Sequence, residues 1–305
     1  MKTLLRRTAL TIAALAASLS AAAPAQQTLP VPVAQQQPAP ARPAMWKVAD
    51  ADTTIYLFGT IHALPPGIEW FDGRIATAFE SSQELVTEIV ETEPAQMQKL
   101  VLAKSVLPAG KSLRDMFTPK QKADFEASLT ANGLPVQTFD RMKPWYAAVF
   151  LSTLPILRGG FDPANGVEQA LGARGKALGR AHGALETAEY QLGLFDSLPE
   201  DVQLRYLAEV VENMPEARNV LAGMVEAWKR GDAATLARMM NEEEDDPVLL
   251  ERLLTNRNKA WADWIDKRLD RPGTVFLAVG AGHLAGGGSV QDQLASKGIA
   301  TNRVQ

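Results

Sequence analysis

From residue 45 onward the apolar residues of the chain follow two different spacings. The segments 45–50 (MWKVAD) and 53–61 (TTIYLFGTI) have the pattern of strands, and the polar residues 50–52 between them predict a hairpin. The next segment, 71–82 (FDGRIATAFESS), has apolar residues at helical spacing, and 83–90 (QELVTEIV) returns to a strand pattern. The predicted order is a hairpin, a loop, a helix and a further strand.

A similar order returns at the C-terminal end. A strand is predicted at 274–282 (TVFLAVGAG), a short helix at 287–298 (GGSVQDQLASKG) and a final strand at 299–304 (IATNRV). Little residue identity connects this segment with the first one. The shared layout nevertheless predicts two equivalent βαβ units, at 54–91 and 274–304.

The residues between these units are mostly helical in pattern. Apolar positions recur at helical spacing in 197–214, 215–232 and 247–269, and a short strand is possible at 183–187. The predicted fold class is therefore α/β. Its central mixed sheet would come from the two βαβ-like units and be flanked by helices, with a helical insertion in the middle of the chain.

The first 44 residues have the composition of an export signal and a tether. Residues 1–25 combine a basic start, a short stretch of Ala and Leu, and a small-residue ending at Ala23-Pro24-Ala25, which is typical of a cleaved signal peptide. Residues 26–44 are rich in Pro, Gln and Ala and are predicted to be an extended linker. We expect a folded domain at 45–305 and a periplasmic or secreted location.

The composition restricts the chemistry and the partners. The chain has no cysteine, which excludes disulfides, thiolate metal sites and a cysteine nucleophile. The predicted signal carries three positive charges and no negative ones, so its removal would change the formal net charge from −4 to −7. No block of Lys or Arg remains to bind nucleic acid, and no later apolar run is long enough to cross a membrane.

Two of the three histidines follow the same motif. His62 ends Gly59-Thr60-Ile61-His62 and His283 ends Gly280-Ala281-Gly282-His283, each just past a predicted strand. Parallel strands would place both imidazoles at one edge of the sheet, where α/β proteins bind ligands and where imidazoles could hold a metal ion. The alternative is that each histidine forms only structural hydrogen bonds.

Carboxylates at nearby strand ends are candidates for the same site. Glu88 interrupts the apolar run of 83–90, where a carboxylate is costly unless it is paired or bound to a metal. It would be half-exposed if this strand lies at an edge. Glu186 stands at the end of the possible strand at 183–187.

Arg257 lies in the apolar stripe of the long helix predicted at 247–269, between Leu254 and Trp261. If its guanidinium is buried, it must pair with a carboxylate or stabilise a developing oxyanion. The alternative is that the side chain reaches past the stripe into water. Asn258 beside it could donate or accept a hydrogen bond in the same cleft.

Three segments together resemble a known family. They are 46–65 (WKVADADTTIYLFGTIHALP), 185–201 (LETAEYQLGLFDSLPED), and 256–265 (NRNKAWADWI) with 274–286 (TVFLAVGAGHLAG). In this order they resemble the bacterial TraB/GumN proteins, which are related to the animal Tiki proteases and to the pheromone-shutdown protein PrgY. The chain departs from these proteins in the polar segment GRAHGA before Leu185, where relatives usually have a more apolar strand.

The resemblance implies one site for the paired motifs. It implies that His62 and His283 lie together, that Glu88 is the glutamate after the first motif, and that Arg257 is the arginine before the second. In the Tiki branch these residues belong to a metal-dependent protease reported with Mn or Co.

The leading hypothesis is an exported metal-dependent hydrolase, namely a peptidase acting on a peptide or another small extracytoplasmic substrate. His62, Glu88 and His283 would bind a divalent ion (Mn, Co or Zn) that activates a water molecule. Glu186 would be a fourth ligand or a general base, and Arg257 would stabilise the oxyanion. The alternatives are a non-catalytic protein that sequesters a peptide or polysaccharide fragment, and a purely structural cluster of the same residues.

Overall fold

The computed structural model describes residues 40–71, 73–242 and 246–305, and its centre is a six-stranded sheet. The strand order is β4-β3-β5-β2-β1-β6. The bounds are β1 Met45–Ala49, β2 Thr53–Thr60, β3 Glu84–Thr87, β4 Ala181–Ala184, β5 Gly273–Gly280 and β6 Asn302–Arg303. Strands β2, β5, β3 and β4 run parallel, whereas β1 runs antiparallel to both β2 and β6. The predicted mixed sheet is confirmed.

The two predicted βαβ units interleave in this sheet. β5 lies between β2 and β3, and both β2 and β1 lie between β5 and β6. The strands of each unit are therefore not neighbours. The interleaving places β5 in the middle of the parallel part of the sheet, with β2 on one side and β3 on the other.

Helices cover both faces of the sheet, which explains why its central strands are almost continuously apolar. Phe276 and Ala278 of β5 pack in one core with α2 (Gly73–Ser81) and α6 (Val167–Ala177). Val275 and Leu277 pack on the opposite face with α12 (Asn256–Leu269) and α13 (Val290–Ser296). The arrangement is that of helices on two sides of a sheet.

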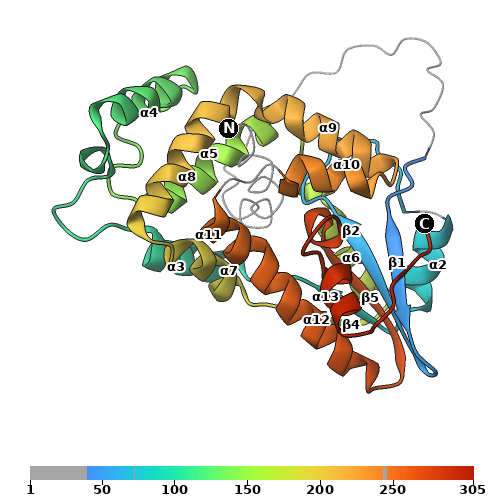
Figure 1. The fold of residues 1–305 in the computed structure, drawn as a ribbon. Coiled ribbons are helices and arrows are strands. Elements are labelled where there is room, and N and C mark those ends of the chain that lie inside the picture. The colour runs from blue at the N-terminus through green and yellow to red at the C-terminus, as the bar shows by residue number, and fades with distance from the viewer. Residues whose placement is uncertain (1–39, 72, 243–245) are drawn as a thin grey trace, which may run out of the picture.

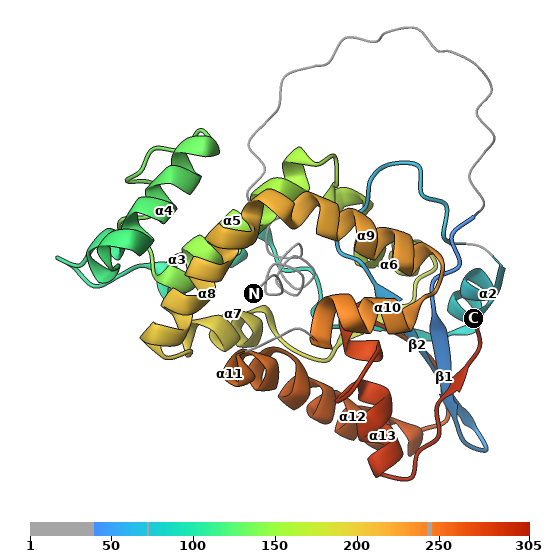
Figure 2. The same cartoon turned by 45° about the horizontal axis from the view of Figure 1, so that its top comes forward.

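The predicted helical insertion is confirmed as a separate part beside the sheet (Figures 1 and 2). It has its own apolar core, which includes Phe125, Trp145 and Leu207. Its helices are α3 Pro94–Ser105, α4 Pro119–Ala131, α5 Pro144–Arg158, α7 Ala188–Asp196 and α8 Glu200–Asn213. Helices α9 Ala217–Lys229 and α10 Ala233–Ala237 then return the chain to the sheet core.

One long helical run links the helical part with the sheet. It consists of α11 (Pro247–Leu250), the π-helical segment η6 (Glu251–Thr255) and α12, and it runs diagonally in Figure 1. Leu253 of η6 packs in the core of the helical part, and Trp261 of α12 packs in a sheet core. The predicted helix at 247–269 is thus present and crosses from one core to the other.

The predicted export signal at 1–25 and most of the predicted linker lie outside the described residues. Ala41 and Ala44, which fall within the predicted linker, are buried, and the backbone N–H of Ala41 donates to the Glu69 carbonyl. In the described part of the chain, no helix combines the length and apolar character needed to cross a membrane.

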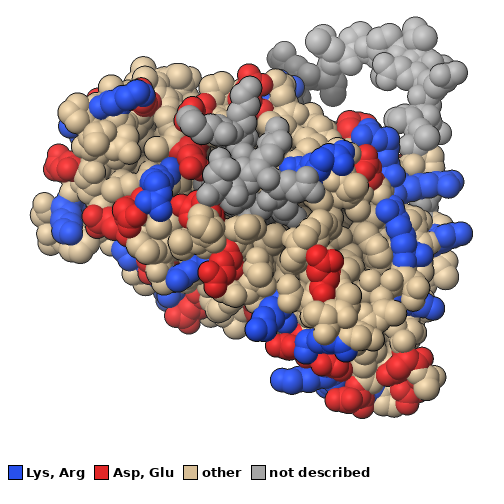
Figure 3. All heavy atoms as spheres, in the orientation of Figure 1, with Lys and Arg blue, Asp and Glu red and all other residues tan. Residues whose placement is uncertain are grey.

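The surface carries charges of both signs. On the face shown in Figure 3, acidic and basic side chains are interspersed over the helical part, and basic ones gather on the side formed by β1 and the C-terminal segment. No single sign of charge dominates this face.

Candidate functional site at the carboxyl edge of the parallel strands

The four parallel strands bring four predicted site residues to one edge of the sheet. His62 lies two residues past β2, Glu88 one past β3, Glu186 two past β4 and His283 three past β5. The backbone N–H of Glu186 donates to the Glu88 carbonyl at 2.8 Å, which continues the pairing of β3 with β4. The edge is the one where α/β sheets place their ligand sites.

Three glycines allow the backbone to pack closely around this edge. A Cβ on Gly59 would lie 3.2 Å from Ala281, and one on Gly280 would lie 3.2 Å from Glu88 Oε1. A Cβ on Gly166 would lie only 2.3 Å from the His62 carbonyl oxygen. The glycines of the two Gly-x-x-His motifs therefore serve close approach, and Gly166 brings α6 against the loop of His62.

Arg257 is the centre of a buried ion cluster. Its side chain is 0 % exposed, and its Nη2 donates to Glu88 Oε2 at 2.6 Å and to Glu186 Oε2 at 2.8 Å. Its Nε donates to Glu186 Oε1 at 2.9 Å, and its Nη1 donates to the Leu253 carbonyl at 3.2 Å. The guanidinium also lies over the Trp261 ring, 4.7 Å from its centroid. Arg257 thus pairs with carboxylates and does not reach into water.

His283 is held at both ring nitrogens. Asn258 donates its Nδ2 to the Gly288 carbonyl at 2.8 Å, which turns its Oδ1 toward His283 Nδ1 at 2.6 Å. Nδ1 therefore carries the proton, and Nε2 accepts a hydrogen bond from Arg257 Nη1 at 3.1 Å. The ring also packs against Trp261, with 4.4 Å between centroids.

The surroundings of Glu88 favour its charged form. Burial raises the pKa of this carboxyl, but other groups, chiefly the Arg257 guanidinium and also the Gly280 N–H, lower it by more, so the pKa lies well below its ordinary value of 4.5. Oε1 accepts the Gly280 N–H at 2.8 Å, and Oε2 accepts a further bond from Gln191 Nε2 at 3.0 Å. Glu88 is a fixed carboxylate.

His62 forms a second pair with Glu168, in the first turn of α6. Its Nδ1 lies 2.6 Å from Glu168 Oε1, which also accepts a hydrogen bond from the Thr60 hydroxyl. Burial lowers the pKa of His62, but the carboxylates of Glu168 and Glu88 raise it by more, so the pKa lies above 6.5. With Nδ1 bound to a carboxylate, Nε2 is the ring nitrogen that remains for chemistry.

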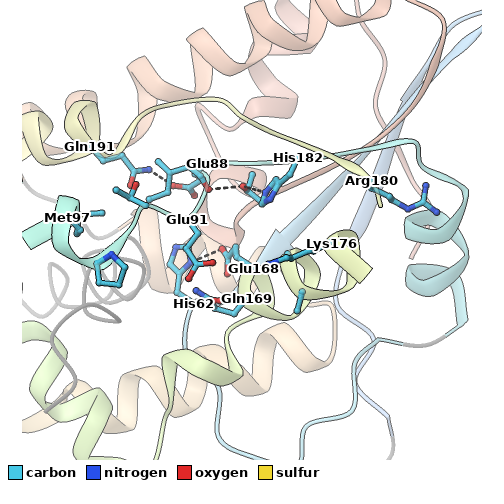
Figure 4. A pocket seen from close by; sticks show the side chains of 16 residues that line it. His62, Glu88, Glu91, Met97, Glu168, Gln169, Lys176, Arg180, His182 and Gln191 are labelled. Carbon is cyan, nitrogen blue, oxygen red and sulfur yellow. Dashed lines mark hydrogen bonds and ion pairs between the residues drawn. The ribbon is translucent and has the colours of Figure 1, made fainter. Parts of the chain in front are cut away.

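A cavity of about 570 Å³ opens beside this pair (Figure 4). His62, Glu88 and Glu168 line it together with Gln191 and His182. Glu186, Arg257, Asn258 and His283 are not part of its lining, and lie in the buried cluster behind it. The structure thus brings all six predicted residues to one region but exposes only His62 and Glu88 to the cavity.

The donor set fits a metal ion in part. Nε2 of His62 and Oε1 of Glu88 lie 3.8 and 3.2 Å from the point where a Gly280 Cβ would be, so two predicted ligands converge. His283 turns its Nε2 to Arg257. Within the described residues, no group of three or more His, Asp or Glu side chains is arranged to hold an ion. His283 could become a third ligand only if its Nε2 gave up the hydrogen bond from Arg257 and bound the ion instead.

Sequence reasoning did not find Glu168 and Gln191. Glu168 lies more than a hundred positions from His62, in a helix whose apolar pattern carries no mark of a site. The one local signal is Gly166 just before that helix, because a glycine there permits close packing. Gln191 lies on α7, where a buried amide is costly without partners such as Glu88 and Glu186.

Comparison with known proteins decides the family. The model of the TraB/PrgY/gumN family matches residues 44–303, which include both Gly-x-x-His motifs, Glu88 and Arg257. The chain belongs to the TraB/PrgY/gumN family. Relatives of the chain include an uncharacterized protein from Treponema pallidum and the uncharacterized protein YbaP from Escherichia coli.

Each of these two relatives is 23% identical in sequence to this chain. The Treponema pallidum protein matches over 81% of this chain and 78% of its own length, and YbaP over 78% and 87%. A Shigella flexneri protein, also named YbaP, matches to the same extent. No solved structure matches the chain. The names of these relatives assign no activity, so the chemistry has to be argued from the site.

Proposed function

We propose that the protein is an exported metal-dependent hydrolase that cleaves peptide bonds. The observation that carries this proposal is the orientation of His62. Its Nδ1 is held by the Glu168 carboxylate, so its Nε2 can face the cavity beside the ionised carboxylate of Glu88. A carboxylate–histidine pair that presents one basic nitrogen to a cavity is the usual support of a metal-ligating imidazole.

His62 and Glu88 would hold the ion, and the residues behind them would position these two. When bound, a divalent ion of Mn, Co or Zn lowers the pKa of a water molecule and polarises a carbonyl. Glu168 fixes the imidazole of His62, and Arg257 fixes the carboxylate of Glu88. Glu186 and Asn258 would act indirectly, because Glu186 positions Arg257 and Asn258 positions His283.

Metal binding tests the proposal directly. Purified chain freed of metal by chelation would be titrated calorimetrically with Mn²⁺, Co²⁺ and Zn²⁺ in turn. We expect one ion per chain, and we expect His62→Ala to weaken binding by about 100-fold or more, since even loss of a supporting partner costs 10- to 100-fold. His182→Ala is the matched control, because His182 lines the same cavity but is hydrogen-bonded to Thr87 and forms no ion pair among the residues that the structure describes. A wild-type chain that binds none of the three ions refutes the metal site.

Turnover is tested with a peptide library analysed by mass spectrometry. Cleavage should stop on addition of a chelator and return with the metal, and it should be absent in Glu88→Gln. Cleavage that is unaffected by chelation would contradict the metal-dependent mechanism.

A second candidate is a protein that sequesters a peptide or polysaccharide fragment without cleaving it. The observation in its favour is that Arg257 already forms hydrogen bonds with Glu88, Glu186 and His283, so each of these side chains has a partner without a metal ion. Ligand binding that survives chelation, with no product from any library peptide, would favour this function.

The proposed location outside the cytoplasm rests on the sequence of residues 1–25. Cell fractionation followed by N-terminal sequencing tests it. The mature chain should begin near residue 26 and occur in the periplasm or the medium, and an intact Met1 in the cytoplasm would contradict export.

A further inference from the structure

The cavity has opposite charges along one wall, and α6 forms that wall. Glu168, Gly172, Ala173 and Lys176 of α6 all line the cavity. Glu168, Gly172 and Lys176 are spaced four apart and so lie on one face of the helix. The wall therefore runs from a carboxylate beside His62, over two small residues, to a lysine.

Two further charged residues of the cavity lining follow the same polarity. Glu91 lines the cavity near His62 and Glu168, whereas Arg180 lies beyond Lys176 (Figure 4). Glu91 is exposed, and neither it nor Lys176 forms an ion pair with any residue that the structure describes. Arg180 donates a hydrogen bond to the Glu80 carbonyl, and it also forms no ion pair with a described residue. Glu91 and Lys176 thus each carry a charge that remains for a ligand.

The middle of the wall has room for a ligand backbone. A Cβ placed on Gly172 would meet only the Cε1 of His182, at 3.9 Å, so the space above this glycine is open. Eight residues of helix separate Glu168 from Lys176, which is a rise of roughly 12 Å. An extended peptide covers about 3.3–3.6 Å per residue, so three or four residues span this length.

We propose that the cavity binds a short peptide of three or four residues in extended form along α6, with its free C-terminal carboxylate at Lys176 and its free amino group at Glu91. This inference rests on the proposed function, since it names the class of substrate that the hydrolase would accept. The peptide backbone between the two ends would pass over Gly172 and beside His62 and Glu88.

The test measures whether the contribution of the peptide carboxylate to the affinity depends on Lys176. Trialanine and its C-terminal amide would be titrated calorimetrically into the wild-type chain and Lys176→Gln, in chelator so that turnover does not consume the peptide. In the wild type, amidation should weaken binding about fivefold, since the lost bond joins two charged groups. In Lys176→Gln, the acid and the amide should bind alike. Lys111→Gln, at an exposed position outside the cavity lining, should behave as the wild type.

The amino end is tested in the same way. N-acetylation of trialanine should weaken binding to the wild type and make no difference to Glu91→Gln. Gly172→Val, which fills the wall, should weaken binding of every tripeptide.

The outcomes separate the inference from the proposed function. The inference is overturned if amidation lowers the peptide affinity of Lys176→Gln by the same factor as that of the wild type. It is also overturned if trialanine does not bind. A chain that binds metal and cleaves long peptides internally, without binding tripeptides, would overturn the inference and leave the hydrolase standing. A chain that binds tripeptides but no metal would retain the inference about the ligand and favour the sequestering function.

Discussion

Arg257 carries a permanent charge at a position with no exposed surface, so its partners decide whether the site can exist. Burial lowers the pKa of the guanidinium, but Glu88 and Glu186 raise it by more, and the charged form is favoured. In turn the two carboxylates depend on Arg257, because each would otherwise be buried without a cation. The cluster is therefore mutually dependent, and loss of its centre costs more than the loss of one ion pair.

Replacing Arg257 should destabilise the protein strongly. We expect Arg257→Met to lower the free energy of unfolding by about 3–5 kcal/mol, the usual cost of leaving buried charges unpaired. Urea denaturation followed by circular dichroism measures it. Arg205→Met is the control, since Arg205 is half-exposed in its pairs with Asp201 and Asp246 and should change stability little. Equal effects of the two substitutions would show that the buried cluster contributes no special stability.

The depressed pKa of Glu88 predicts a pH-dependent part of the stability. Because the folded pKa lies below 4.5, the contribution of Glu88 is fully present above that pH and is lost as the pH falls below it. The difference in unfolding free energy between the wild type and Glu88→Gln should therefore be largest near neutral pH and shrink below about pH 4.5. Urea denaturation from pH 7 to pH 3 measures it.

The matched control for this prediction is Glu189→Gln, because the Glu189 side chain is largely exposed and its ion pair within the described residues is with the surface residue Lys104. Its difference from the wild type should stay nearly constant with pH. A difference for Glu88→Gln that is also constant down to pH 3 would contradict the assignment of Glu88 as a carboxylate with a lowered pKa.

At the scale of elements, Gly166 fixes how α6 meets the sheet. The helix begins directly after this residue, and the Val167 N–H donates to the Ile61 carbonyl, so the first turn lies against the loop of His62. A side chain at position 166 would push this turn away. The pairing of His62 with Glu168 depends on the distance between the two elements, and it should therefore depend on Gly166.

Gly166→Ala should lower the free energy of unfolding by about 1–3 kcal/mol, because its Cβ would collide with a backbone carbonyl. It should also weaken metal binding by separating Glu168 from His62. Gly193→Ala is the control: it lies inside α7, nothing is within 4 Å of its Cβ, and alanine in a helix is favourable by up to about 1 kcal/mol. Denaturation and calorimetry measure both effects. An unchanged stability in Gly166→Ala would mean that α6 can shift freely.

The sequence predicts which segments form strands better than it predicts which strands pair with one another. The strands expected at 45–50, 53–61 and 274–282 are present, because uninterrupted apolar or alternating runs bounded by turns leave few other structures. The position of β5 between β2 and β3 is not encoded in any local period, since it is a pairing between distant segments. The strand predicted at 83–90 is shorter in the structure, where β3 ends at Thr87.

The same limit applies to the site. His62 and His283 could be found because each follows a strand in the same motif, and strand ends meet at one edge. The partners of these residues depend on helix packing. Glu168 reaches His62 only because α6 folds against the loop after β2, and Gly166 is the one local signal of that contact in the sequence. The roles proposed from the sequence for His62, Glu88 and His283 as ligands stay predictions.

At the scale of the whole molecule, the site lies where the helical part meets the sheet. Gln191 of α7, which belongs to the helical part, donates to Glu88 Oε2 at 3.0 Å and to Glu186 Oε2 at 2.9 Å. Arg257 holds the same two carboxylates from the long helix that crosses between the cores. The hydrogen bonds of the site thus also join the two parts of the protein.

If this junction couples the two parts, then Gln191→Leu should separate their unfolding. Native-state hydrogen exchange measured at increasing urea would follow amides of α5 and α8 in the helical part, and amides of β2 and β5 in the sheet. In the wild type both groups should open at the same urea concentration. In Gln191→Leu the helical part should open first, because two buried carboxylates lose their hydrogen bonds to α7 while the sheet keeps its own pairing. Gln96→Leu, at an exposed position of α3, should leave the two groups together. If the groups also stay together in Gln191→Leu, the apolar contacts of the long helix are sufficient to couple the two parts, and the polar site contributes only to chemistry.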